Sequence, residues 1–130
     1  MKVWKKLQFD AAHRLMGHEK CGRLHGHTWT VEVEIDGPID AETGMVLDFG
    51  EIKKRIMEKF DHKTILCEDD PLIEPIKEIV GMESLMVMNN KPTSENIAYE
   101  IAKALRVKGS VKVTVYETPT ARAELEVMML

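Results

Sequence analysis

Apolar and polar residues alternate over two segments near the N-terminus, residues 2–13 and 24–36. The apolar positions, all odd-numbered, are Val3, Leu7, Phe9, Ala11, Trp29, Val31, Val33 and Ile35, with Lys5 as the exception. A period of two is typical of strands that bury one face. The pattern therefore predicts two strands, which we expect to pair as an antiparallel hairpin.

The same alternation returns near the C-terminus. Val111, Val113 and Val115 alternate with polar residues up to Glu117, and a second run covers residues 123–129. The turn-forming stretch Thr118-Pro119-Thr120 separates the two runs. This pattern predicts a second hairpin.

Two segments have the spacing of amphipathic helices. The first runs from about Asp48 to Phe60, with Asp48 as its N-cap and Glu51 at the capping-box position. The second opens at Pro92-Thr93-Ser94-Glu95 and ends before Gly109. Their apolar stripes consist of Phe49, Ile52, Ile56, Met57 and Phe60, and of Ile97, Ala98, Ile101, Ala102 and Leu105.

The segment between Cys67 and Asn90 is harder to interpret, because Pro71 and Pro75 interrupt it. A short helix over 73–80 and a short strand over 85–88 are its best interpretation. The whole order predicts one α+β domain over residues 1–130. In it, two helices cover one face of a four-stranded antiparallel sheet.

Composition narrows the functional classes. A net charge of -4, without a cluster of basic residues, disfavours nucleic-acid binding. No apolar run is long enough to span a membrane, and the N-terminus lacks the apolar core of a signal peptide. Two cysteines do not make a disulfide framework. Together these features predict a cytoplasmic protein.

Three histidines provide the candidate chemistry. His25 and His27 share one strand face, and the expected hairpin brings His13 beside them. Three imidazoles suit Zn²⁺, with a fourth position open to water or substrate, as in catalytic zinc sites. The sequence thus predicts one zinc ion per subunit.

Cys21 lies in the connecting loop, four residues before His25. A thiolate close to a dication has a lowered pKa, which would suit a catalytic base. The alternative is that Cys21 is a fourth zinc ligand. The zinc would then be structural, and the protein a non-catalytic binding module.

Two further features have structural as well as functional interpretations. Asp61-His62 directly follows the first helix, where carboxylate–histidine pairs are common on surfaces. Glu117 ends an apolar strand face beside a turn. It is either a solvated turn residue or a buried carboxylate that needs a partner.

Five motifs occur here in the order of one known family: Phe9-Asp10-Ala11-Ala12-His13-Arg14-Leu15, Cys21 to His27, Asp61-His62, Pro92-Thr93-Ser94-Glu95 and Tyr116-Glu117-Thr118. The chain resembles the 6-pyruvoyltetrahydropterin synthase superfamily over nearly its whole length. Three residues separate Cys21 from His25, a gap similar to that of the 6-carboxy-5,6,7,8-tetrahydropterin synthases of 7-deazaguanine (queuosine and archaeosine) biosynthesis. The pyruvoyl-forming activity on the same substrate is the alternative within the family.

The resemblance implies the tunnelling fold, in which such units form a barrel as a homo-oligomer, a trimer or stacked-trimer hexamer, with active sites between subunits. It implies a zinc-dependent lyase that converts 7,8-dihydroneopterin triphosphate to 6-carboxytetrahydropterin, acetaldehyde and triphosphate. Zinc would be held by His13, His25 and His27. The remaining implied roles are those of Cys21 as base, Asp61 and His62 as proton relay, Glu117 as pterin anchor and member of the relay, and Thr93, Ser94 and Glu95 in ring recognition. Arg14, Lys20 and Arg23 are candidates for triphosphate contact.

Overall fold

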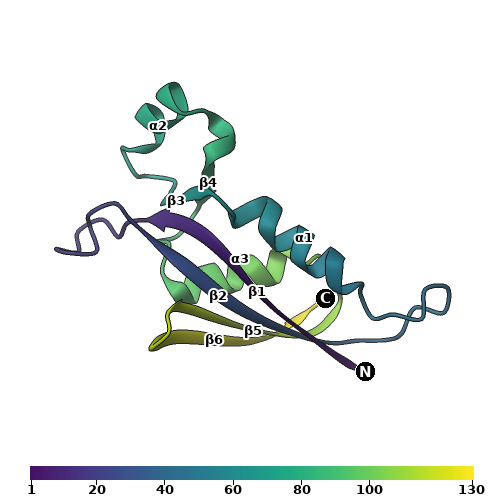
Figure 1. Ribbon diagram of the computed structural model, residues 1–130. Coiled ribbons are helices and arrows are strands. Elements are labelled where there is room, and N and C mark those ends of the chain that lie inside the picture. The colour runs from purple at the N-terminus through teal and green to yellow at the C-terminus, as the bar shows by residue number, and fades with distance from the viewer.

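A six-stranded mixed sheet organises the computed structural model, which describes residues 1–130 (Figure 1). Its strand order is β4-β3-β1-β2-β5-β6. The strands are β1 (Lys2–His13), β2 (His25–Asp36), β3 (Lys63–Cys67), β4 (Leu85–Met88), β5 (Gly109–Thr118) and β6 (Ala121–Met129). The helices are α1 (Phe49–Phe60), α2 (Ile73–Ile79) and α3 (Ser94–Ala104), with a 3-10 turn η1 (Met82–Ser84).

The two predicted hairpins are confirmed. β1 and β2 pair antiparallel along their whole length, with Phe9 opposite Trp29 and His13 opposite His25. β5 pairs antiparallel with both β2 and β6. The uninterrupted β1–β2 register fixes the histidine positions at one end of the hairpin.

Helices α1 and α3 cover one face of the sheet (Figure 1). Most of their apolar stripes meet the odd-numbered strand residues in a single cluster of 22 buried residues, against which Met57 packs partly buried. The prediction was wrong for Phe49, the first residue of α1, which is 53% exposed. α1 begins at the predicted cap, Asp48, and α3 begins within the predicted opening, with Thr93 as its cap. The Asp48 carboxylate accepts from the amides of Gly50 and Glu51, and the Thr93 hydroxyl accepts from the Asn96 amide.

The predicted count of four strands was wrong, because β3 and β4 extend the sheet beyond β1. β3 runs parallel to β1, but only over Ala11–His13, and β4 runs parallel to β3. The short strand predicted over 85–88 is confirmed as β4, whereas β3, with five residues, is too short for alternation to distinguish it from a loop. The α+β class and the antiparallel pairing of β1, β2, β5 and β6 are as predicted.

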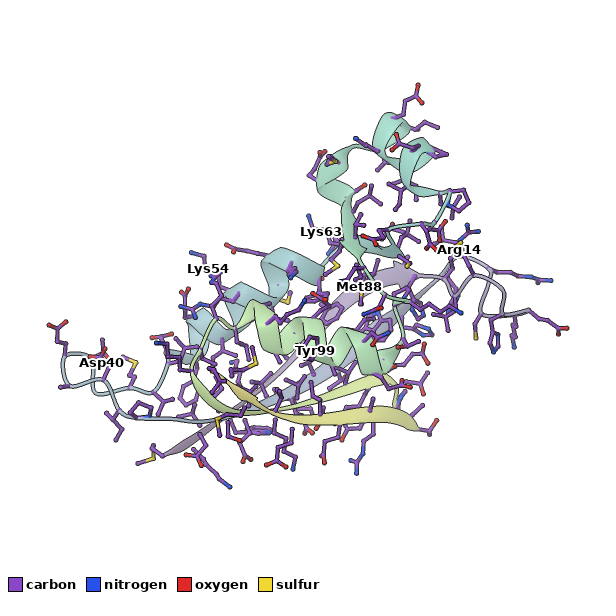
Figure 2. The ribbon with its side chains drawn as sticks, turned by 180° about the vertical axis from the view of Figure 1, so that it is seen from behind. Arg14, Asp40, Lys54, Lys63, Met88 and Tyr99 are labelled. Carbon is purple, nitrogen blue, oxygen red and sulfur yellow. The ribbon has the colours of Figure 1, made fainter.

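The segment 68–90 forms a lobe whose helix α2 stands away from the main core, while β4 returns to the sheet (Figure 1). Its helix α2, predicted over 73–80 and observed over Ile73–Ile79, buries none of its residues. A paired charge ties the base of this lobe to the end of β1. Arg14 lies below this lobe (Figure 2). Its guanidinium donates two hydrogen bonds to the Asp70 carboxylate, at 2.8 and 2.5 Å.

This ion pair predicts an acid-sensitive contribution to stability. The hydrogen bonds from Arg14 lower the pKa of Asp70 from its ordinary value of 3.8. Because the folded-state pKa is the lower one, the contribution is complete above about pH 4 and is lost as the pH falls through the folded-state pKa. Asp70→Asn should therefore cost roughly 1–3 kcal/mol of unfolding free energy at neutral pH and less near pH 3. Urea unfolding at both pH values measures this, and a pH-independent cost would contradict it.

Candidate metal centre

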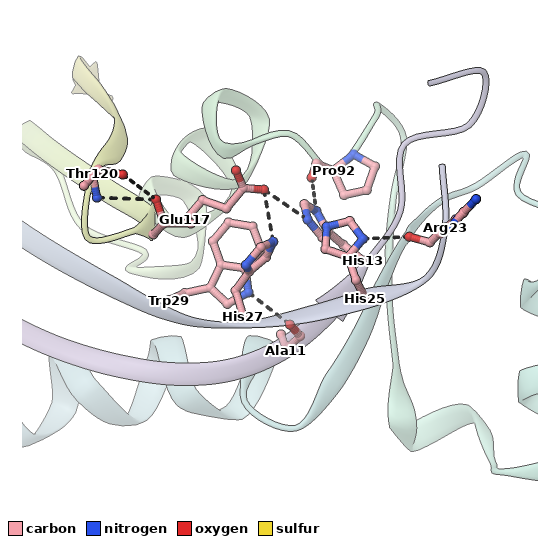
Figure 3. A network of polar contacts seen from close by, with 10 residues as sticks. Ala11, His13, Arg23, His25, His27, Trp29, Pro92, Glu117 and Thr120 are labelled. Carbon is pink, nitrogen blue, oxygen red and sulfur yellow. Dashed lines mark hydrogen bonds and ion pairs between the residues drawn. The ribbon is translucent and has the colours of Figure 1, made fainter. Parts of the chain in front are cut away.

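Three imidazoles meet at the end of the β1–β2 hairpin (Figure 3). His13 is the last residue of β1, and His25 and His27 open β2 on the same face. One ligand atom from each of these histidines, and one from Glu117, lie within 4.8 Å of one another. The rings stand edge to face, with centroids 4.7 to 5.3 Å apart.

Two backbone carbonyls orient these rings. His13 Nδ1 lies 2.8 Å from the Pro92 carbonyl oxygen, and His25 Nδ1 lies 2.6 Å from that of Arg23. A carbonyl only accepts, so each Nδ1 carries the proton and each Nε2 keeps its lone pair. This is the tautomer in which a histidine binds a metal through Nε2 while its other nitrogen is held by a second partner.

Burial favours the neutral form of two of the three histidines. Desolvation is the main cause that lowers the pKa of His13, whose exposed fraction is 1%, and it also lowers the pKa of His27. Metal ligation requires the unprotonated imidazole. The protein therefore holds these two histidines in the protonation state that binds a cation.

Two nitrogens of the cluster are buried without a hydrogen bond, namely Nε2 of His13 and Nε2 of His27. Each lies close to Glu117 Oε1, at 3.2 and 3.3 Å, but neither contact has hydrogen-bond geometry. Buried polar atoms normally have partners, and a site for a bound cation is one explanation of an exception. Three imidazole nitrogens beside a carboxylate are a donor set that suits Zn²⁺. The residues present thus fit the predicted metal.

Glu117 reaches the cluster from β5. It follows the core-facing residues Val113 and Val115, so alternation puts it on the histidine face. The β5–β6 register shifts between Tyr116 and Thr118, which leaves Glu117 without a partner residue on β6. Such bulges often lie beside active sites, where they redirect a side chain. Glu117 is therefore a partner of the histidines, and not a solvated turn residue.

Cys21 lies in the loop between β1 and β2 and is partly buried. It is not a member of the group of residues whose potential ligand atoms meet here, which consists of the three histidines and Glu117. This geometry does not favour the closed site with Cys21 as fourth zinc ligand. The role of Cys21 as a base stays a prediction.

The pair Asp61-His62 lies beside β1, at the exit of α1. The Asp61 carboxylate accepts from the Asp10 amide at 3.1 Å and lies 2.9 Å from His62 Nδ1. Desolvation tends to raise the pKa of Asp61, but the Asp10 amide and His62 together outweigh it and hold that pKa below its ordinary value. Asp61 is therefore an ionised partner for His62.

His62 is exposed and adopts a left-handed backbone conformation, with φ of 58°. It lines an open surface pocket of about 530 Å³, which His27 also borders, together with the strand residues Asp10, Ala12 and Thr28. These strand residues alternate with Ala11, His13 and His27, so their side chains point to the opposite face of the sheet. Within one chain, the structure does not bring His62 to the histidine cluster.

The start of α3 borders the cluster through Pro92, whose carbonyl holds His13. The Thr93 hydroxyl is used in capping, and the first helical residues, Ser94 and Glu95, are partly and fully exposed. A helix start presents unpaired backbone N–H groups. The predicted recognition residues therefore lie at one edge of the site.

Sequence reasoning missed the role of the Pro92 carbonyl and the partner of Arg14. Pro92 acts through its carbonyl, which every residue type has, so no sequence signal marks it. Arg14 was a candidate for triphosphate contact, but its guanidinium is paired with Asp70. Lys20 and Arg23, which flank Cys21, remain as candidates.

The model of the family described as "6-pyruvoyl tetrahydropterin synthase" matches residues 2–127. The chain belongs to this family. The family resemblance seen in the sequence is thereby confirmed, and it covers both the histidine cluster and Glu117.

Curated members of the 6-pyruvoyl tetrahydropterin synthase family are similar along the whole chain. A protein of Rickettsia felis, named 6-carboxy-5,6,7,8-tetrahydropterin synthase, is 37% identical over 96% of this chain and 99% of its own length. Proteins of the same name from Rickettsia conorii and Haemophilus influenzae are 39% and 34% identical, again over 96% of this chain, and over 99% and 98% of their own lengths.

Solved structures of the family share the fold. The 6-pyruvoyl tetrahydropterin synthase of Plasmodium falciparum superposes with a TM-score of 0.69 at 21% identity, over 99% of this chain and 98% of its own. An uncharacterized protein of Wolinella succinogenes, WS1659, gives 0.71 at 26% identity, over 96% and 97%. None of the helices of the present chain has the length and apolar character needed to cross a membrane.

Proposed function

We propose that this protein is a zinc-dependent 6-carboxy-5,6,7,8-tetrahydropterin synthase, with zinc held by His13, His25 and His27. The reaction would convert 7,8-dihydroneopterin triphosphate to the 6-carboxy product, acetaldehyde and triphosphate, in the cytoplasm. The observation that carries the proposal is the buried pair of unpartnered Nε2 atoms, on His13 and His27, beside Glu117. The names of the full-length relatives favour this activity over the pyruvoyl-forming one.

Bound zinc would supply a Lewis acid that makes protons on the adjacent substrate carbons and hydroxyls easier to remove. The chain's own residues provide the rest. Trp29 packs edge to face against His13 and His27, at 4.9 and 5.3 Å between ring centroids. Its indole, which is fully buried, excludes water from the inner side of the site.

Glu117 would anchor the pterin ring. Its side chain is 32% exposed, so one part of the carboxylate faces the histidines while the rest is open to a ligand. A carboxylate accepts two N–H groups of a guanidine-like ring edge in a charge-assisted contact. The free N–H groups at Ser94 and Glu95 would complete ring recognition from the start of α3.

Cys21 would act as the base, and Asp61 would orient His62 for proton relay. His62 lies on the opposite face of the sheet from its own chain's histidines, so the proposal requires a site shared between copies of the chain. The relay would then serve the metal centre of a neighbouring subunit.

Open strand edges support the proposed homo-oligomer. β3 covers the outer edge of β1 only over Ala11–His13, so Lys2–Asp10 has no strand partner on that side. β6 is the other edge of the sheet, with β5 as its single neighbour. Unpaired edges of this length are templates for pairing with another chain. Joining β1 of one copy to β6 of the next would extend the sheet toward a barrel of three or six subunits.

The pterin-anchor role predicts the effect of Glu117→Gln. The amide keeps one acceptor but loses the charge and one of the two hydrogen bonds. We expect kcat/KM to fall about 10- to 100-fold, from the loss of one charge-assisted bond. Steady-state kinetics measures this, and Glu58→Gln on the exposed face of α1 is the matched control. An unchanged kcat/KM would contradict the anchor role.

A coupled assay tests the proposed reaction itself. The zinc-loaded protein is incubated with 7,8-dihydroneopterin triphosphate, and acetaldehyde is followed through NADH oxidation by alcohol dehydrogenase. We expect acetaldehyde release that disappears after zinc is stripped and returns when it is restored. A folded, zinc-loaded protein that releases none would contradict the proposal.

A further inference from the structure

The loop between β1 and β2, residues 14–24, carries Cys21 and folds back on itself. The Leu15 amide donates to the Cys21 carbonyl at 2.7 Å, which closes the loop at its base. A Cβ at Gly22 would lie 2.2 Å from the His18 carbonyl oxygen, so the turn accepts no side chain there. The loop thus has a defined internal shape, and its orientation depends on what holds its ends.

Arg14, at the start of this loop, is held by the lobe. Its Nε and Nη2 atoms donate to the two oxygens of Asp70, and the Leu72 amide donates to Asp70 Oδ1 at 2.8 Å. The Asp70 side chain is 1% exposed and that of Arg14 is 20% exposed. A bidentate pair fixes direction as well as distance, because the guanidinium and the carboxylate are both planar.

Asp70 itself is fixed by the short parallel strands. Its amide donates to the Cys67 carbonyl at the end of β3, at 2.9 Å. The Glu68 amide donates to the Met88 carbonyl at the end of β4, at 2.7 Å. These two bonds therefore attach the segment that carries the Asp70 carboxylate to the sheet, although α2 beyond it buries none of its residues.

We propose that Asp70 is a positioning residue, which holds the Cys21 loop in its working orientation through Arg14, and that this is a role of the 68–90 lobe. The inference rests on the proposed function, in which the Cys21 thiol acts on the substrate. A buried ion pair contributes little net stability. The property that matters here is that the bidentate pair fixes the direction of the Arg14 side chain. Arg14 passes this orientation on to the loop because it lies, in the sequence, between His13 and Leu15. The Leu15 amide in turn donates to the Cys21 carbonyl.

Two variants, Asp70→Asn and Arg14→Lys, test whether the Arg14–Asp70 pair orients the loop. Lysine is chosen because it keeps the charge of Arg14 but loses the bidentate geometry. Glu68→Gln, at an exposed neighbouring position, is the matched control. The readouts are zinc content, tryptic cleavage after Lys20, iodoacetamide labelling of Cys21 resolved from Cys67 by peptide mass, and steady-state kinetics. All are taken well below the unfolding temperature of each variant.

Both variants should keep one zinc per chain. Their loops should be cleaved and labelled about tenfold faster, because local opening costs less free energy. We expect kcat to fall about 10- to 100-fold, since a displaced catalytic group is costly, while KM changes less than about threefold. The double variant should be no worse than the more affected single variant, since both changes remove one interaction.

Unchanged cleavage and labelling in both variants would overturn the proposal, as would a rise in KM with kcat preserved. Loss of zinc would also overturn it, because the pair would then serve His13 instead of Cys21. The proteolysis and labelling readouts do not require turnover. An inactive wild-type protein would contradict the proposed function, while these two readouts would still decide whether Asp70 holds the loop.

Discussion

Replacing His27 with alanine is expected to abolish stoichiometric zinc binding, and with it all zinc-dependent turnover. The substitution removes one of three nitrogen ligands from a site that offers few replacements. Loss of a group that only orients a ligand costs about 10- to 100-fold in metal affinity, so loss of the ligand itself should cost more. Elemental analysis after gel filtration measures the bound zinc. His27 is preferred to His13 because it is partly exposed, so its removal disturbs the core less.

His18→Ala provides the control for this experiment. His18 is an exposed histidine in the neighbouring loop and lies outside the ligand group. The variant should keep one zinc per chain. A His27→Ala protein that still binds one zinc with unchanged affinity would contradict the assignment of the metal centre.

The second large effect is expected for Cys21→Ala. If the thiolate is the base, zinc content stays at one per chain while kcat falls about 10²- to 10⁴-fold, the usual contribution of a general acid or base. Cys67→Ala, which removes the other cysteine, should leave kcat unchanged. Zinc analysis beside steady-state kinetics separates the two roles of Cys21. Loss of zinc from Cys21→Ala would restore the closed, structural zinc site as the better interpretation.

The hairpin that carries the metal centre could be predicted from sequence because its determinants are local. Strict alternation fixed the faces of β1 and β2, and continuous antiparallel pairing then placed His13 opposite His25. Alternation along β5 also predicts that Glu117 lies on the same face of the sheet as the histidines. For these residues, a face and a register were sufficient to place the side chains together.

The remaining parts of the fold and of the site depend on contacts between residues far apart in the sequence, which local patterns do not predict. β4 lies where the sequence predicts a short strand, over 85–88, but β3 is short and pairs in parallel, so neither turn chemistry nor alternation marks it. Arg14 and Asp70 are 56 residues apart, and their pairing follows from the way β3 places the lobe. Asp61-His62 lies on the sheet face opposite the histidines, and a site between subunits cannot be read from one chain's periodicity.

The central claim is tested most directly by the mass of the pterin product. The zinc-loaded protein is incubated with 7,8-dihydroneopterin triphosphate under anaerobic conditions, and the products are separated and weighed by mass spectrometry. We predict 6-carboxy-5,6,7,8-tetrahydropterin, whose side chain has lost two carbons as acetaldehyde. A 6-pyruvoyl product that keeps all three side-chain carbons would contradict the proposed activity.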